Sequence, residues 1–132
     1  MNKTNFKDLL LEKPLLRLIE KNFSKPTDVQ AKTMPLVIEG MDVIASSATG
    51  SGKTLAFASG TIQNTEPDYG LQVLVLTPTR ELAEQISEVY KTFSEYIPFI
   101  FSKIFANTNS SFKNPTCKLV AFIVKNKIYL KN

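Results

Sequence analysis

The sequence contains no histidine and only one cysteine, Cys117. Without histidine, the chain can form neither a Ser-His catalytic pair nor a histidine-based metal site. A lone cysteine excludes an internal disulfide and a cysteine-based zinc site. We therefore expect Cys117 to be a buried or idle thiol in a reducing compartment, and we expect other residue types to carry the chemistry.

Long apolar runs are also absent. No run approaches the roughly 18 residues that a transmembrane helix needs, and residues 1–8 lack the apolar core of a signal peptide. The chain has 132 residues, of which 43% are hydrophobic and 21% charged, and this is typical of one globular domain with a sizeable core. We expect an intracellular protein, cytoplasmic or nuclear, that has no membrane partner.

Acidic residues stop at Glu95. Residues 1–95 hold 10 Lys and Arg against 12 Asp and Glu, whereas residues 96–132 hold six Lys and no acid. Such asymmetry can mark a nucleic-acid-binding tail. We divide the chain into residues 1–97 and a divergent basic tail, residues 98–132. Two interpretations of the tail stay open: a truncation or gene-model artefact, or a genuine basic tail that folds as a hairpin.

A phosphate-binding motif lies between an expected strand and an expected helix. It comprises Ser47, Ala48, Thr49, Gly50, Ser51, Gly52, Lys53 and Thr54. Glycines let the backbone approach a phosphate, and successive N–H groups at a helix N-terminus then face the anion. Lys53 would reach the outer phosphates and Thr54 would bind Mg²⁺ through its hydroxyl, which makes these two the candidate catalytic residues. Ser47 replaces the first glycine of the common motif.

Hydrophobic periodicity predicts an α/β fold. The expected helices cover about residues 8–23, 26–39, 53–63 and 80–95, and the expected strands cover 42–46, 71–76 and 97–105. Their alternation indicates a parallel sheet with flanking helices. Pro35 should kink the second helix or end its regular part, and Gly40 should end it.

Three signals follow one another along the chain. Phe6 with Pro26-Thr27 and Gln30 comes first, the loop at residues 47–54 second, and Pro78-Thr79-Arg80-Glu81-Leu82-Ala83 third. In this order they resemble the Q motif, motif I and motif Ia of the DEAD-box ATP-dependent RNA helicases, over about residues 6–97. The resemblance implies a partial RecA-like P-loop domain with ATP and Mg²⁺ as cofactors and RNA as partner.

The same resemblance assigns the adenine site. Gln30 would read adenine, since a side-chain amide can pair with N6 and N7 at once. Phe6 would stack on the base, and Thr27 would tie the Q-motif loop to the phosphate loop or to the base. The alternatives are that Gln30 is only a polar residue in a helix's first turn and that Phe6 anchors the N-terminus.

Motif Ia implies an RNA site. Pro78, Thr79 and Arg80 would hold the sugar-phosphate backbone of single-stranded RNA without reading its sequence. The alternative is that Thr79 merely caps a helix and that Arg80 pairs with Glu84 one turn later.

Hydrolysis in this family also uses an Asp-Glu-Ala-Asp motif on a later strand and a second RecA-like domain. Since no acid follows Glu95, this sequence contains no such downstream motif. We therefore expect a fragment of an ATP-dependent RNA helicase that is catalytically incomplete by itself, while the intact parent would hydrolyse ATP and remodel RNA duplexes. The alternative is a non-catalytic nucleotide- and RNA-binding module.

Overall fold

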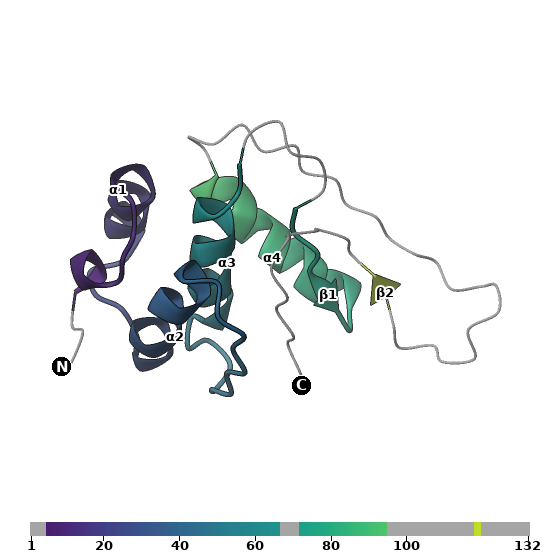
Figure 1. The fold of residues 1–132 in the computed structure, drawn as a ribbon. Coiled ribbons are helices and arrows are strands. Elements are labelled where there is room, and N and C mark those ends of the chain that lie inside the picture. Colours follow the sequence, from purple (N-terminus) through teal and green to yellow (C-terminus); the bar gives the residue numbers. More distant parts are fainter. Residues whose placement is uncertain (1–4, 67–71, 95–117, 120–132) are drawn as a thin grey trace.

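The computed structural model describes residues 5–66, 72–94 and 118–119 (Figure 1). Within these ranges, helix α3 lies between helices α2 and α4, and α1 lies beside a short 3₁₀ helix, η1, and also contacts α4. The elements in chain order are η1 (Phe6–Asp8), α1 (Lys13–Asn22), α2 (Asp28–Ile38), α3 (Lys53–Gln63), β1 (Leu76–Thr77), α4 (Arg80–Phe93) and β2 (Lys118–Leu119).

Local sequence signals account for both ends of α2. Thr27 is the N-cap and forms a capping box with Gln30. At the other end Gly40 adopts a φ of 76°, and its N–H donates to the carbonyl of Val37 at 3.0 Å, so the helix end has a backbone partner there. The predicted stop at Gly40 is therefore confirmed. Pro35 does not end the helix, which continues to Ile38.

The helices predicted after the phosphate motif are confirmed. Helix α3 has the predicted bounds, and α4 begins at Arg80 after the N-cap Thr79. The buried side of α4 carries Ala83, Ile86 and Tyr90, at the spacing of one helical face.

Helix α3 forms the centre of the hydrophobic core. All its residues from Leu55 to Ile62 are buried. The hydroxyls of Thr61 and Tyr90 form a buried hydrogen bond of 2.6 Å that joins α3 to α4. Burial raises the pKa of the Tyr90 phenol well above its ordinary value, so this group stays protonated and able to donate.

The predicted strands are only partly formed. Residues 42–46 are not a strand in the structure, and Ile44 is 82% exposed. Burial alternates along residues 72–77 as in a strand, but only Leu76–Thr77 pairs, and it does so antiparallel to Lys118–Leu119. A strand needs a hydrogen-bonded neighbour, and the described residues provide none beside residues 42–46. The strand predicted over 97–105 lies outside the described residues.

The contact between α2 and α3 requires a glycine in mid-helix. A Cβ added to Gly60 would lie 2.5 Å from Cγ1 of Val37 and 3.0 Å from the backbone nitrogen of Ile38. Glycine normally weakens a helix interior, but here it lets the end of α2 approach the backbone of α3. Close approach of the two helices therefore explains its presence.

We predict that Gly60→Ala lowers the free energy of unfolding by about 1–3 kcal/mol through overpacking, although alanine is favoured over glycine in a helix by about 1 kcal/mol. Urea denaturation followed by circular dichroism measures the change. Val37→Ala in the Gly60→Ala background removes one of the clashing atoms, so the double variant should lose less than the sum of the single losses. Stabilisation by Gly60→Ala would show that the helices do not approach this closely.

Candidate nucleotide and RNA site

The phosphate loop is shaped by two glycines in the left-handed region. Gly50 has a φ of 80° and Gly52, the N-cap of α3, has a φ of 85°. These values suit glycine because other residues resist them. No atom lies within 4 Å of the place where a Cβ on Gly50 would be, so open space adjoins the loop there.

Three groups beside this space suit an anion. Helix α3 has no side-chain cap, so the N–H groups of its first turn receive no side-chain acceptor. The hydroxyl of Ser51 is buried without a hydrogen-bond partner among the described residues. The ammonium of Lys53 donates to the carbonyls of Ser47 at 2.5 Å and Ala48 at 2.8 Å. Orphan N–H groups, an orphan hydroxyl and an adjacent cation fit a polyphosphate.

Thr54 stands one residue inside α3, directly after Lys53. Its hydroxyl is an oxygen donor, the ligand type that Mg²⁺ prefers. No group of three or more His, Cys, Asp or Glu side chains that could hold a metal ion occurs in the described ranges. The donor chemistry at Thr54 thus fits a metal that is held mainly by the phosphates of a nucleotide.

Two side chains of α2's first turn are bonded to the phosphate loop. The hydroxyl of Thr27 donates to the carbonyl of Ser51 at 2.7 Å, and Nε2 of Gln30 donates to the carbonyl of Gly52 at 3.2 Å. Oε1 of Gln30 also accepts from the backbone N–H of Thr27 at 3.0 Å. The structure therefore shows the link between Thr27 and the phosphate loop that the sequence suggested.

The amide of Gln30 faces the protein rather than solvent. The residue is only 2% exposed, and a Cβ on Gly52 would lie 2.2 Å from its Nε2. Sequence reasoning missed the capping box between Thr27 and Gln30, although the pattern Thr-x-x-Gln predicts one. Reading of adenine by Gln30 stays a prediction, and it requires the side chain to leave these bonds.

Phe6 is buried in the structure. Its side chain is 0% exposed and belongs to the hydrophobic core, so neither face of its ring is open to a base in this structure. The phenyl group gains more by burial in the core than it would at an open surface. Stacking of Phe6 on a base stays a prediction that requires the ring to leave the core, and anchoring of the N-terminal segment is the alternative.

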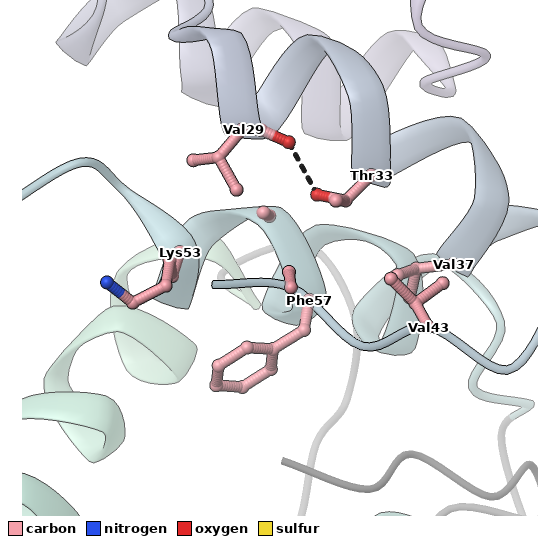
Figure 2. Close-up of a pocket in the computed structure, with 8 residues that line it drawn as sticks. Val29, Thr33, Val37, Val43, Lys53 and Phe57 are labelled. Atoms are coloured by element: carbon pink, nitrogen blue, oxygen red, sulfur yellow. Dashed lines mark hydrogen bonds between the residues drawn. The ribbon is translucent and has the colours of Figure 1, made fainter. Parts of the chain in front are cut away.

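A small apolar cavity of about 30 Å³ lies between α2 and α3 (Figure 2). It is too small for a nucleobase, and Lys53 extends its ammonium away from it. The hydroxyl of Thr33 is turned to the carbonyl of Val29, with which it forms a hydrogen bond of 2.6 Å. The lining residues are Val29, Thr33, Val37, Val43, Ala45, Lys53, Ala56 and Phe57. The open space at the loop, rather than this cavity, is therefore the candidate ligand seat.

The motif Ia residues form a second exposed site at the start of α4. Pro78, Thr79 and Arg80 are all exposed. Thr79 accepts a hydrogen bond from the N–H of Leu82 at 3.2 Å, and Nε of Arg80 donates to Oε1 of Glu84 at 3.0 Å. Capping and ion pairing, the structural alternatives, are thus both present. They leave the hydroxyl proton of Thr79 able to donate to a phosphate.

The comparisons with known proteins decide the family. The sequence model of the DEAD/DEAH box helicases matches residues 27–126. The chain belongs to the DEAD/DEAH box helicase family. This match extends past residue 97, and the division of the chain at that residue stays a prediction.

Relatives of this DEAD-box chain are similar over most of its length. It is 46% identical over 92 residues to the RNA helicase CrhR of Synechocystis, which is 69% of this chain and 19% of that protein. It is 41% identical over 107 residues to the human ATP-dependent RNA helicase DDX39A, which is 80% of this chain and 25% of that protein. The chain thus spans about a fifth to a quarter of these curated relatives.

Solved structures confirm a partial RecA-like fold. A DEAD box protein from Methanococcus jannaschii superposes with a TM-score of 0.74 at 36% identity, covering 79% of this chain and 29% of that chain. The RNA helicase Prp28 from Chaetomium thermophilum, bound to ADP, gives a TM-score of 0.71 at 27% identity and covers 86% and 30%. Among the described residues, no helix of this DEAD-box chain is long and apolar enough to cross a membrane.

Removal of the Thr27 hydroxyl should loosen the loop and uncap α2. We predict that Thr27→Val lowers the free energy of unfolding by about 1–2 kcal/mol, because the variant loses the N-cap bond to Gln30 and the bond to Ser51. Thr27→Ser keeps the hydroxyl and serves as the matched control, with a change well below that of Thr27→Val. Urea denaturation of both variants measures the difference, and equal losses would mean that the hydroxyl bonds contribute little.

Proposed function

We propose that residues 47–54 of this chain bind the phosphates of ATP or ADP together with Mg²⁺. The observation that carries the proposal is the loop geometry. Two left-handed glycines lead into an uncapped helix N-terminus, with the Lys53 ammonium and open space beside Gly50. A phosphate placed there would meet N–H donors and a cation, which is the usual arrangement of a nucleotide phosphate seat.

Binding at this seat is an exchange of partners. The Lys53 ammonium, now held by the carbonyls of Ser47 and Ala48, would move to a phosphate oxygen. A charged acceptor replaces two neutral ones, so the exchange strengthens the hydrogen bond. The Ser51 hydroxyl, orphaned in the free loop, would gain a partner at the same time. Thr54 would contribute one oxygen to Mg²⁺, whose role is to neutralise phosphate charge.

The adenine half of the site would need a rearrangement. Gln30 is the residue that reads the base in this proposal, and its amide must exchange the bonds to Thr27 and Gly52 for bonds to adenine. The relative Prp28 is described in complex with ADP, which supports nucleotide binding by this fold. Phe6 is not part of the proposed seat, because it is buried.

We further propose that Pro78, Thr79 and Arg80 contact the backbone of single-stranded RNA. All three are exposed, and the hydroxyl of Thr79 and the guanidinium of Arg80 are phosphate donors at a helix N-terminus. Both curated relatives are named RNA helicases, which supports RNA as the ligand. Such contacts would position a strand without reading its bases.

The activity of the intact protein would be ATP-dependent remodelling of RNA duplexes, as the names of the relatives suggest. A second candidate is a binding module that holds nucleotide and RNA without turnover. The observation that favours it concerns residues 1–132 alone: no acid follows Glu95 within them, so these residues supply no Asp-Glu-Ala-Asp carboxylates after motif Ia.

Lys53→Ala should weaken binding of MgADP and MgATP about 10- to 100-fold, since the variant loses a charge-assisted hydrogen bond to phosphate. Isothermal titration calorimetry measures the affinities. Lys21→Ala, which removes an exposed lysine from α1, is the control and should bind as the wild type does. Wild-type affinity in the Lys53→Ala variant would remove this lysine from the site.

Turnover tests the second candidate. We expect the 132-residue chain to bind MgATP without releasing phosphate, even with saturating single-stranded RNA, because it lacks the carboxylates that position the attacking water. A phosphate-release assay with the chain, and with Lys53→Ala as the background control, measures this. RNA-stimulated release above that background would show that the binding-module interpretation is wrong.

A further inference from the structure

Arg80 stands at the first position of α4 and is engaged within its own helix. Its Nε donates to Oε1 of Glu84 at 3.0 Å, and both side chains remain about half exposed. A cation in the first turn of a helix is poorly placed, because the helix N-terminus is itself positive. The carboxylate one turn later offsets that repulsion and gives the guanidinium an anionic partner.

A phosphate that uses Nε of Arg80 would have to take the place of this carboxylate. Both groups are anions with oxygen acceptors, and the N–H groups of a guanidinium can donate to either one in a fork. When phosphate displaces Glu84, the freed carboxylate stays on the same face of α4, one turn from the bound anion. The exchange therefore costs the ion pair and adds repulsion between like charges.

We propose that Glu84 is a positioning residue that competes with RNA phosphate for Arg80 and thereby lowers the affinity of the motif Ia site. This inference rests on the proposed RNA contact at Pro78, Thr79 and Arg80. Glu84 does not touch the RNA in this scheme. It acts only through the guanidinium of Arg80, and its influence falls as salt screens exposed charges.

The helix carries a matched control for this idea. Glu88 lies one turn beyond Glu84, is exposed, and forms an ion pair with Lys91 at 2.7 Å. Glu88→Gln makes the same chemical change in the same helix as Glu84→Gln, and glutamine matches glutamate in helix propensity. Glu84→Gln removes the carboxylate that pairs with Arg80, whereas Glu88→Gln removes the carboxylate that pairs with Lys91.

The test is fluorescence anisotropy with a short labelled oligouridylate, at low and at physiological ionic strength, on the full chain. We expect Glu84→Gln to tighten binding about two- to fivefold at low salt and less at higher salt, given that an exposed helical ion pair is worth about twofold and the lost repulsion adds to it. Glu88→Gln should bind like the wild type. Urea denaturation should show that Glu84→Gln is no more stable than the wild type, which separates a change in binding from a general gain in stability.

A double-mutant cycle with Arg80→Ala decides the mechanism. The proposal requires that Arg80→Ala weakens binding and that adding Glu84→Gln to it gives no gain. A gain that persists without Arg80, or an equal gain from Glu88→Gln, would overturn it in favour of a general charge effect. No gain from Glu84→Gln while Arg80→Ala weakens binding would overturn the inference alone. Wild-type affinity of Arg80→Ala would instead overturn the proposed RNA contact on which it rests.

Discussion

The close approach of α2 to α3 is the constraint on which the rest of the structure depends. Gly60 lets Val37 at the end of α2 lie against the backbone of α3, and Gly52 gives the same freedom to Gln30 at the other end. A Cβ at either glycine would separate the helices or displace the amide. Because the two helices pack this closely, Thr27 and Gln30 at the start of α2 form hydrogen bonds directly with backbone carbonyls of the phosphate loop.

In this geometry, two polar side chains both cap α2 and form hydrogen bonds with the phosphate loop. Thr27 caps α2 and also bonds the carbonyl of Ser51, and Gln30 closes the capping box and also bonds the carbonyl of Gly52. These bonds occupy backbone groups near the starts of α2 and α3, where the carbonyl of Gly52 also accepts from the N–H of Ala56. The loop conformation is therefore coupled to the start of α2, and a ligand that moves either Gln30 or the loop must also disturb the other.

The sequence predicted α2, α3, α4 and the loop well, because their determinants are local, whereas the helix predicted over 8–23 forms only as α1, Lys13–Asn22. The bounds of α3, the cap at Thr79 and the stop at Gly40 all follow from residues within one turn of the boundary. The strand at residues 42–46 failed for the opposite reason. An apolar run becomes a strand only beside a hydrogen-bonded partner, and no local pattern reveals whether that partner is present.

The roles of the site residues were harder to predict because burial is decided by packing. A motif places Phe6 and Gln30 near a base, but it cannot show that the phenyl ring is 0% exposed or that the amide is already bonded on both sides. Residues whose role depends on backbone conformation, such as Gly50, were predictable from the motif alone, because few residues other than glycine adopt their φ.

The two proposed phosphate contacts differ in what the phosphate must displace. At Lys53 the present partners are neutral carbonyls, so exchange for a phosphate introduces a new attraction between opposite charges. At Arg80 the present partner is a carboxylate, so one anion replaces another and the released charge remains nearby. The same kind of donor should thus give a strong seat for nucleotide and a weak one for RNA.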